Sequence, residues 1–316
     1  MVAKVFIDGA AGTTGLEIRE RLAGRRDLEL VQLSDARRKD TGARREALNE
    51  SDMVILCLPD EAAREAVSLI EAGNVRVIDA STAHRTAPGW AYGFPELDPV
   101  QREAIAASHR VSNPGCYPTG FLALVRPLVR GGIVPVDFPL TVNAVSGYSG
   151  GGKAMIEEFE AKDSPRYVET AVRTYALTLA HKHVPEMRVH AGLAHPPVFA
   201  PSVGRYYRGM IVEVPLQLWA LPGKPSVADL HAALDRAYAD EALVEVASLE
   251  ESVTATNLDA ELFKLTNGMK LFVFGNDKTQ QARLVAVLDN LGKGAGGAAV
   301  QNLNIMLGLP ETTGLV

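Results

Sequence analysis

The sequence predicts an α/β protein with two domains: a Rossmann-type domain with a parallel sheet, then an α+β catalytic domain with a mixed or antiparallel sheet. Three observations support this fold class. Strand-like and helix-like segments alternate in the first part of the chain, a glycine-rich turn follows the first strand, and later strands alternate apolar and polar residues. With 316 residues, the chain is long enough for two hydrophobic cores.

The N-terminal segment has the pattern of a phosphate-binding turn. A buried strand is predicted over 4-KVFIDG-9 and a helix over 16-LEIRERLAG-24, with 9-GAAGTTG-15 between them. Glycines let the backbone turn sharply and let a pyrophosphate approach the free N–H groups at the helix N-terminus. A glycine-rich turn without a ligand is the alternative. The residues that we expect to bind the cofactor phosphates are Gly9, Gly12, Thr13, Thr14 and Gly15.

Strand–helix alternation continues after this turn. Strands are predicted over 28-LELVQL-33, 53-MVILCLP-59 and 75-VRVIDAS-81, and a helix over 60-DEAAREAVSLIEAG-73. Such alternation is typical of a parallel sheet with helices on both faces.

The end of the second strand, 34-SDARRKD-40, bears on the choice of cofactor. An acidic residue at this place binds the ribose 2′-hydroxyl of NAD, and Asp35 is available for that role. Ser34, Arg37, Arg38 and Lys39 crowd the same place, and a serine hydroxyl and guanidinium groups suit the 2′-phosphate of NADP better than the hydroxyl of NAD. The sequence favours NADP over NAD; a solvated basic turn is the remaining interpretation.

The second half of the chain predicts a mixed or antiparallel sheet with helices to one side. Strands are indicated within 138–152, where a glycine-rich turn follows, and over 209–218 and 282–290, where apolar and polar residues alternate. Helices are predicted over 153–161 and 226–240, the second with Ser226 as its N-cap.

One of only two cysteines lies in an unusual setting. Cys116 belongs to 113-NPGCYPTG-120, a turn rich in Pro and Gly ahead of a helix predicted from residue 120. A helix N-terminus favours the thiolate, and its free N–H groups stabilise an oxyanion formed when the thiolate attacks a carbonyl carbon. We predict a nucleophile. A buried structural cysteine is the alternative here and the better interpretation for Cys57, which lies in an apolar strand.

A thiolate nucleophile needs a proton carrier, and one of the histidine-containing segments offers it. In 181-HKHVPEM-187, two histidines precede an acid. If this stretch is extended, His181 and His183 share a face, and Glu186 follows a proline that ends regular structure. A carboxylate beside an imidazole fixes its tautomer and tunes its pKa. A purely structural role for these histidines stays equally open.

A dinucleotide fold with a cysteine nucleophile indicates one kind of chemistry. A thiolate takes an acyl group as a thioester, a nicotinamide then gives it a hydride, and the product collapses to an aldehyde. The sequence therefore predicts an enzyme that reduces an activated acyl group or catalyses the reverse oxidation.

Composition excludes several other classes. The net charge is −6 and there is no strong basic stripe, so nucleic acid is not an expected partner. Nowhere are there 18 consecutive apolar residues, no Cys/His spacing resembles a zinc site, and the N-terminus lacks the features of a signal peptide. We expect a cytoplasmic protein with reduced thiols, no metal and no membrane partner.

Four motifs are spread along the chain: 9-GAAGTTG-15, 112-SNPGCYPTG-120, 181-HKHVPE-186 and 292-GKGAGGAAVQNLNIMLGLPETTGL-315. Together they resemble the short form of the N-acetyl-gamma-glutamyl-phosphate reductase family of arginine biosynthesis. Two further segments, 79-DASTAHR-85 and 146-SGYSGGGK-153, also fit the family. The resemblance therefore runs from residue 1 to the end of the chain.

The resemblance implies an organisation similar to that of aspartate-semialdehyde dehydrogenases. Residues 1–115, completed by a C-terminal helix over 297–316, would form the NADP domain, and residues 116–296 the catalytic and oligomerisation domain. It implies NADPH-dependent reduction of N-acetyl-γ-glutamyl phosphate, a small-molecule acyl phosphate, to N-acetyl-glutamate semialdehyde and phosphate. It also implies a homo-oligomer, a tetramer.

The same resemblance implies roles for individual residues. Cys116 is the nucleophile that displaces phosphate, His181 the acid/base, and Glu186 its orienting partner. Asn276 and Gln301 either bind the nicotinamide carboxamide or cap a loop. Arg85 would bind the substrate phosphate through its guanidinium group. The implied substrate contacts are Arg85, Ser146, Ser149, Gly150 and His183.

Two other functions remain as alternatives. One is a reductase of a related acyl phosphate, such as aspartyl phosphate or a carrier-bound aminoadipyl phosphate. The early position of HKHVPE argues against the first, and the net charge of −6 gives no sign of a basic docking face for the second. The other is an NADP-binding redox sensor with Cys116 as its thiol, which would need neither the histidine motif nor Arg85.

Overall fold

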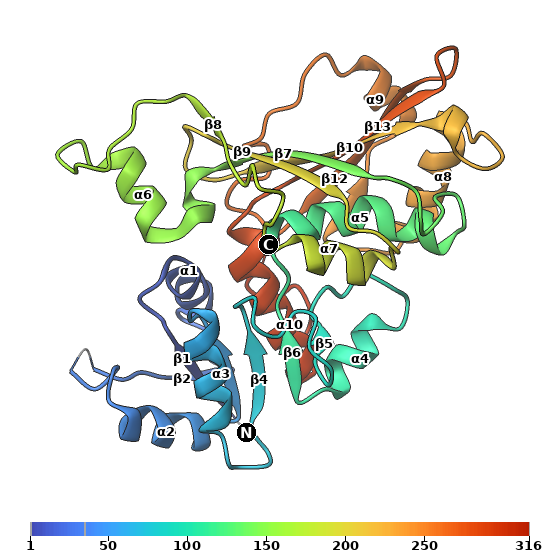
Figure 1. The fold of residues 1–316 in the computed structure, drawn as a ribbon. Coiled ribbons are helices and arrows are strands. Elements are labelled where there is room, and N and C mark those ends of the chain that lie inside the picture. The colour runs from blue at the N-terminus through green and yellow to red at the C-terminus, as the bar shows by residue number, and fades with distance from the viewer. Residues whose placement is uncertain (1, 35, 316) are drawn as a thin grey trace. The chain divides into compact units, whose positions relative to one another are not determined.

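A computed structural model of the chain describes residues 2–34 and 36–315, which form two compact units (Figure 1). The first unit holds the chain up to Pro95, then Pro99–Gly115 and the segment from Ala295 onward. The second holds Glu96–Asp98 and Cys116–Gly294. After the roles that the sequence predicts, the first is called the nucleotide unit and the second the catalytic unit.

The nucleotide unit contains a sheet of six parallel strands in the order β2-β1-β3-β4-β6-β5. Its central strand β3 is buried along its whole length, as its apolar sequence predicts. The predicted Rossmann-type parallel sheet is confirmed. The strands are β1 (Ala3–Asp8), β2 (Leu28–Val31), β3 (Met53–Leu56), β4 (Arg76–Asp79), β5 (Ala91–Tyr92) and β6 (Arg110–Ser112).

Five helices accompany this sheet. The last of them comes from the C-terminal end of the chain and packs on β4, α1 and α4. Because β1 lies between β2 and β3, the strand order reverses at its carboxyl end, which is where open α/β sheets bind ligands. The helices are α1 (Thr13–Leu22), α2 (Thr41–Asn49), α3 (Asp60–Ser68), α4 (Gln101–Ala107) and α10 (Gly297–Leu307).

Helix α3 ends earlier than its sequence predicts. The pattern indicates a helix up to Gly73, yet the helix stops at Ser68. Asn49 is the reason, because its side chain accepts hydrogen bonds from the N–H groups of Glu71 and Ala72 and donates to the carbonyl of Leu69. These backbone groups are satisfied without a further helical turn.

The catalytic unit is built on a mixed sheet of seven strands in the order β11-β12-β13-β10-β7-β9-β8. The pairs β7–β9 and β11–β12 are parallel and the others antiparallel, as a mixed sheet requires. The strands are β7 (Thr141–Gly147), β8 (Val172–Thr174), β9 (Val198–Gly204), β10 (Met210–Gln217), β11 (Val244–Val246), β12 (Met269–Asn276) and β13 (Gln281–Leu288).

Helices pack against this sheet, most closely α5, which contacts β10, β12 and β13. A Cβ atom at Gly120 of α5 would lie 2.9 Å from Cγ2 of Val212, so glycine permits this close approach. Helix α8 begins with the predicted Ser226 cap, completed by Asp229 as a capping box. The helices are α5 (Cys116–Arg130), α6 (Gly152–Glu160), α7 (Val184–Ala191), α8 (Val227–Tyr238) and α9 (Leu249–Thr254), with short turns η1 (Tyr148–Gly151), η2 (Leu218–Ala220) and η3 (Gly292–Gly296).

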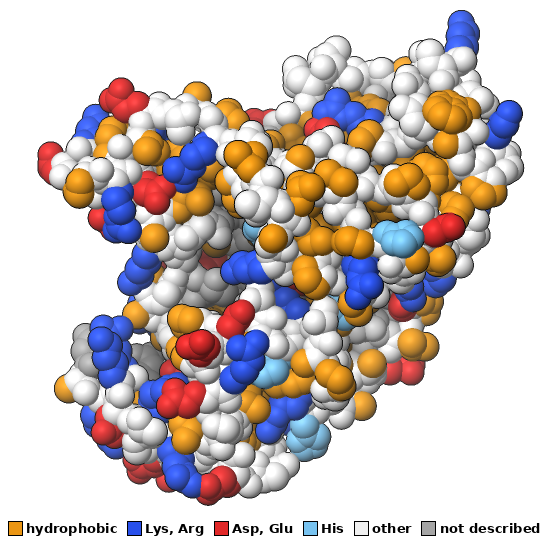
Figure 2. Space-filling view, viewed as in Figure 1, with side chains coloured by type: hydrophobic (Ala, Val, Ile, Leu, Met, Phe, Trp, Pro, Cys, Tyr) orange, Lys and Arg blue, Asp and Glu red, His pale blue; other side chains and the backbone are white. Residues whose placement is uncertain are grey.

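Charged side chains of both signs are interspersed over the face drawn in Figure 2. No helix among residues 2–34 and 36–315 combines the length and apolar character that crossing a bilayer needs. Within the same described ranges, no group of three or more His, Cys, Asp or Glu side chains is arranged to hold a metal ion.

Candidate functional site

The nucleotide unit has a cavity of about 390 Å³ at the carboxyl ends of β1 and β2. The glycine-rich turn forms one wall through Gly9, Ala10 and Ala11. Gly9 has a φ of +89°, and a Cβ atom there would lie 2.3 Å from the carbonyl oxygen of Cys57, so only glycine fits. The turn leads directly into α1, which begins with the predicted residues Thr13 and Thr14. The cavity therefore opens beside a helix N-terminus, as phosphate binding requires.

The basic turn after β2 contributes to the same cavity. Arg38 and Lys39 line it, whereas Arg37 is 58% exposed and pairs with Glu46 of α2 at 3.0 Å. Ser34 is exposed, and its carbonyl oxygen accepts from the N–H groups of both arginines. The possible NAD ligand Asp35 lies outside the described residues.

An ion pair forms the floor of the cavity near β1. The guanidinium of Arg44 in α2 lies 2.9 Å from the carboxylate of Asp8, and both residues are buried. Hydrogen bonds to Asp8 and Glu65 raise the pKa of Arg44, against the opposing effect of burial. The pair fixes α2 to the end of β1 and so holds the shape of the cavity wall.

Cys116 is the first residue of α5, because the helix begins four residues before the predicted start at Gly120; its predicted place at a helix N-terminus agrees with this. The thiol is partly exposed. The N-terminal dipole and free N–H groups of this 15-residue helix favour the thiolate there. The other thiol, Cys57, has its pKa raised to about 12, because the surrounding protein desolvates it and the carboxylates of Asp79 and Asp8 disfavour its charge.

A glycine backbone lies directly against the nucleophile candidate. A Cβ atom at Gly294 would be 2.7 Å from Cβ of Cys116, so any side chain at this position would displace the cysteine. Gly294 belongs to η3, a π-helical turn, and its N–H donates to the carbonyl of Asp289 at 2.9 Å. Single π-helical turns recur at functional sites.

The histidine motif lies in the same unit as Cys116, in a cluster of aromatic rings. The ring centroids of His181 and His183 are 4.7 Å apart, and that of Tyr117 is 6.3 and 5.9 Å from them. The motif is not extended, so the condition for a shared strand face is not met: it forms a turn that leads into α7. Pro185 does not end regular structure but lies in the first turn of α7, where proline lacks only an N–H that would be unpaired anyway.

This turn fixes the tautomer of His181. The backbone N–H of His183 donates to Nδ1 of His181 at 3.2 Å, so the neutral imidazole carries its proton on Nε2. Glu186 is buried in the first turn of α7, with 1% of its surface exposed. Its predicted role as the partner of His181 stays a prediction.

The predicted substrate turn follows β7. Ser146 is near the end of that strand, and Ser149 and Gly150 are in η1. Both serines are buried: Ser146 is 2.7 Å from the Tyr117 hydroxyl, and Ser149 accepts from Nδ2 of Asn290 at 2.9 Å.

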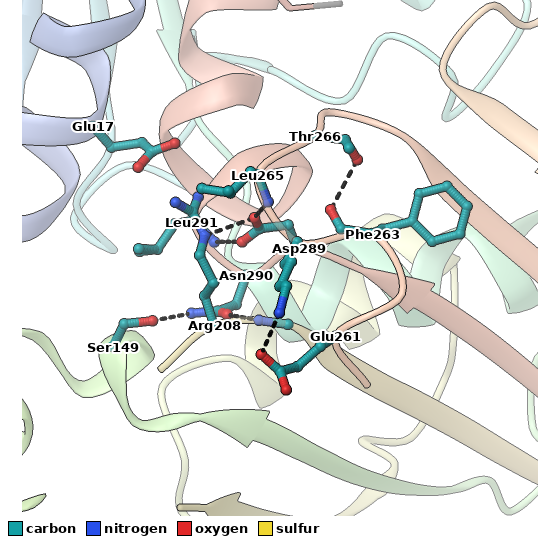
Figure 3. Close-up of polar contacts among 12 residues, drawn as sticks. Glu17, Ser149, Arg208, Glu261, Phe263, Leu265, Thr266, Asp289, Asn290 and Leu291 are labelled. Carbon is teal, nitrogen blue, oxygen red and sulfur yellow. Dashed lines mark hydrogen bonds and ion pairs between the residues drawn. The ribbon is translucent and has the colours of Figure 1, made fainter. Parts of the chain in front are cut away.

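Asp289 and Asn290 form the centre of a polar network that supports this turn (Figure 3). Asn290 also accepts from the N–H of Gly209 at 2.8 Å. The buried Asp289 carboxylate accepts from the N–H groups of Leu265 and Leu291 and pairs with Arg208 at 2.7 Å. Two consecutive residues thereby connect the Ser149 turn with the segment that leads to Gly294.

A fully buried ion pair holds the same segment. The ammonium of Lys293 lies 2.7 Å from the Glu96 carboxylate, and their side chains are 1% and 0% exposed. Lys293 directly precedes Gly294, so the pair fixes the backbone that contacts Cys116.

Lys293→Met should strongly destabilise the catalytic unit, because it removes the ammonium group beside a buried carboxylate. Removing one partner of a buried ion pair costs about 3–5 kcal/mol. We expect urea unfolding, followed by circular dichroism, to show a loss of that size in the free energy of unfolding. Glu96→Leu combined with Lys293→Met is the matched control and should recover most of it; equal losses in the single and double variants would refute this explanation.

The remaining predicted residues have other surroundings. Arg85 is buried and donates from Nε to the carbonyl of Asn113 at 3.0 Å and from Nη2 to that of Ala80 at 3.1 Å. Gln301, in α10, donates to Glu311 at 2.7 Å. Asn276 lies at the exposed tip of the β12–β13 hairpin, where Oδ1 accepts from the N–H groups of the next turn, as a loop cap does. The phosphate and nicotinamide roles of these residues stay predictions.

Several polar residues beside the site carried no sequence signal of their own. The structure adds the Asp289–Asn290 network, the Glu96–Lys293 pair and Tyr175, whose hydroxyl donates to that of Tyr117 at 3.1 Å. Their partners lie far away in the sequence, up to 197 residues for the ion pair. Only Tyr117 could have been suspected, because it follows Cys116 directly.

Comparison with protein families matches both units. Residues 4–108 match the family described as semialdehyde dehydrogenase, NAD binding domain, and residues 116–290 that described as semialdehyde dehydrogenase, dimerisation domain. The first unit thus matches a nicotinamide-nucleotide domain and the second a domain that mediates self-association.

Comparison with individual proteins gives near-complete matches. The N-acetyl-gamma-glutamyl-phosphate reductase of Trichormus variabilis is 55% identical over 318 residues, which cover 99% of each chain. That of Brucella ovis is 55% identical and covers 98% of this chain and 100% of its own.

Solved structures resemble the fold at much lower identity. The aspartate semialdehyde dehydrogenase II of Vibrio cholerae has a TM-score of 0.73 at 14% identity, over 97% of this chain and 98% of its own. A probable aspartate-semialdehyde dehydrogenase of Pseudomonas aeruginosa has a TM-score of 0.74 at 14% identity, over 97% of this chain and 99% of its own. These likenesses confirm the fold.

Proposed function

This chain belongs to the N-acetyl-gamma-glutamyl-phosphate reductase family, and from that premise we propose that it reduces N-acetyl-γ-glutamyl phosphate to N-acetyl-glutamate semialdehyde and phosphate with NADPH. This is a step of arginine biosynthesis. The observation that carries the proposal is Cys116 at the N-terminus of α5, in the same unit as the His181–His183 cluster.

The chemistry follows from the residues of the catalytic unit. The Cys116 thiolate attacks the acyl carbon, the carbon–oxygen bond to phosphate breaks, and phosphate leaves with the electron pair, which gives a thioester. The reduced nicotinamide, when bound, supplies a hydride to this thioester. When the carbon–sulfur bond then breaks, the aldehyde leaves and the thiolate is restored. The N–H groups of the first turn of α5 and Nε2–H of His181 are the donors that we assign to the oxyanion of each tetrahedral species.

The residues of the nucleotide cavity fit a dinucleotide. The glycine turn provides backbone N–H groups and close approach for the phosphates, and the cavity volume suits the adenosine part. Arg38 and Lys39 support NADP over NAD, because both line the cavity and carry the positive charge that a 2′-phosphate needs.

Arg38→Ala should raise the KM for NADPH about tenfold and leave the KM for NADH within about twofold, because a charge-assisted hydrogen bond to the 2′-phosphate is lost. Arg37→Ala is the matched control. Since Arg37 pairs with Glu46 outside the cavity lining, we expect a change below about threefold. Initial rates with each cofactor measure both. A preference of the wild-type enzyme for NADH would overturn the assignment of NADP.

The substrate is tested in the reverse direction, by phosphate-dependent oxidation of N-acetyl-glutamate semialdehyde with NADP or NAD. Aspartate semialdehyde is the control substrate. Selective reduction of NADP with the acetylated substrate is the expected result. Activity with aspartate semialdehyde alone would place the enzyme's function with the aspartyl phosphate reductases. No activity with either, in a protein that binds NADP, would favour the carrier-bound substrate or the redox sensor.

A cytoplasmic homotetramer completes the proposal. Its support is the match of residues 116–290 to a dimerisation domain, from which a tetramer would assemble by pairing of dimers. Sedimentation velocity at micromolar concentration distinguishes dimer from tetramer.

A further inference from the structure

Three hydroxyl groups from distant parts of the chain meet beside the nucleophile. Tyr117 follows Cys116 in the first turn of α5 and is 3% exposed. Its phenol oxygen lies 2.7 Å from Oγ of Ser146 in β7 and accepts a hydrogen bond from the hydroxyl of Tyr175 at 3.1 Å. Tyr175 lies just after β8, so the chain of hydroxyls runs from Tyr175 through Tyr117 to Ser146.

The direction of these hydrogen bonds follows from counting protons. Each hydroxyl has one proton to donate. Because Tyr175 donates to Tyr117, the proton of Tyr117 is directed either to Ser146 at 2.7 Å or to the carbonyl oxygen of Ser202 at 3.4 Å, and the shorter contact is the better hydrogen bond. Ser146 then accepts, and its own proton needs another acceptor.

The structure leaves that proton of Ser146 for a ligand. Among residues 2–34 and 36–315, the hydroxyl of Ser146 has one hydrogen-bond partner, Tyr117. Ser146 is 4% exposed, so bulk water has little access to it. A buried hydroxyl donor without an acceptor is unfavourable unless a bound molecule supplies one.

The phenols keep their protons throughout the working range of pH. Burial raises the pKa of Tyr175 to about 12 and that of Tyr117 well above its ordinary value, and the nearby Cys116 thiolate raises both further. The Tyr117 ring also makes an edge contact with Phe199 and a tilted contact with His183, at centroid distances of 5.1 and 5.9 Å. Both phenols therefore remain protonated and able to donate a hydrogen bond across this range of pH.

We propose that Tyr117 is a positioning residue, which holds Ser146 so that the serine hydroxyl donates to an oxygen of the acyl phosphate bound at Cys116. The inference rests on the proposed function and deepens it. No bond is formed or broken by these groups, and no proton is transferred; Ser146 supplies an oriented hydrogen-bond donor, and Tyr117 with Tyr175 determines its direction.

Tyr117→Phe tests the orientation, because phenylalanine keeps the ring contacts and removes only the proton donated to Ser146. We expect kcat/KM for the semialdehyde to fall about tenfold, the value of one lost oriented hydrogen bond, and the KM for NADP to change less than twofold. Tyr206→Phe is the matched control. Its hydroxyl is buried with no hydrogen-bond partner among the described residues, so we expect kcat/KM to stay within about twofold.

A double-mutant cycle separates positioning from a structural role. In the Ser146→Ala background, Tyr117→Phe should lower kcat/KM less than twofold, because the group that Tyr117 orients is already absent. An equal loss in both backgrounds would overturn the proposal, as would a Tyr117→Phe enzyme within twofold of wild type. The pH profile of kcat/KM should keep its inflections in every variant.

A replacement variant and the choice of substrate keep the double-mutant cycle decisive. If Tyr117→Phe fails to fold, Tyr175→Phe replaces it in the cycle: it removes the first donor of the chain and should lower kcat/KM about threefold with Ser146 present and not at all without it. The cycle is measured with whichever semialdehyde the wild-type enzyme oxidises, so a wrong substrate assignment and a wrong role for Tyr117 give different results.

Discussion

Cys116→Ser should lose at least about a thousandfold in turnover, in both directions, while NADPH still binds. A serine hydroxyl is almost entirely protonated at neutral pH. The N-terminus of α5, which stabilises a thiolate, therefore does not turn the serine into a nucleophile. Cofactor binding should change less than twofold, because the cavity that we assign to the nucleotide is lined by residues of the other unit. Steady-state assays measure the first quantity and NADPH fluorescence titration the second.

Cys57→Ser is the matched control for this substitution. It makes the same chemical change at a thiol whose pKa of about 12 keeps it protonated, and we expect activity within about twofold of wild type. Turnover by Cys116→Ser at the wild-type rate would refute a cysteine nucleophile, and an equal loss in both variants would point to folding instead.

His181→Asn should reduce kcat about a hundred- to ten-thousandfold, the usual value of general acid–base help. Asparagine retains a polar amide but cannot bind and release a proton near neutral pH. The expected effect also follows from the tautomer: with Nδ1 accepting from the N–H of His183, Nε2 is the nitrogen that would present a proton to the reacting oxygen under the proposed mechanism. The binding of NADPH should be almost unaffected. Rapid mixing of enzyme, NADPH and acyl phosphate measures the chemical step directly.

His195→Asn controls for the loss of an imidazole in the same unit, since His195 is exposed on the segment after α7. We expect it to match wild type. A His181→Asn enzyme with a kcat within about twofold of wild type would contradict the acid/base role. The N–H groups of α5 would then be the assigned donors that stabilise the oxyanion.

Local signals made part of this structure predictable. The nucleotide unit follows from apolar strands, a glycine turn and helix-forming segments, each of which acts within a few residues. Cys116 at a helix N-terminus follows from the same kind of signal, a Pro/Gly turn followed by apolar residues at helical spacing. The end of α3 did not follow, because Asn49, at a distance of about twenty residues, decides it.

The histidine motif shows why a local signal can also mislead. A proline after an apolar residue ends a strand or begins a helix, and only the position of α7 against α5 selects between them. The hydroxyl chain was even harder to predict from the sequence, because Tyr117 is separated from Ser146 by 29 positions in the chain and from Tyr175 by 58. Such contacts depend on how strands order themselves in the sheet, which periodicity along the chain does not specify.

The different settings of the two thiols have a practical consequence for studying the protein. At neutral pH a thiol with a pKa of about 12, such as that of Cys57, is ionised in roughly one molecule in a hundred thousand. Because the N-terminus of α5 favours a thiolate, we expect an electrophilic probe to label Cys116 and to leave Cys57 unmodified. Intact-mass spectrometry of the native chain should then show one adduct per subunit, without removal of the second cysteine.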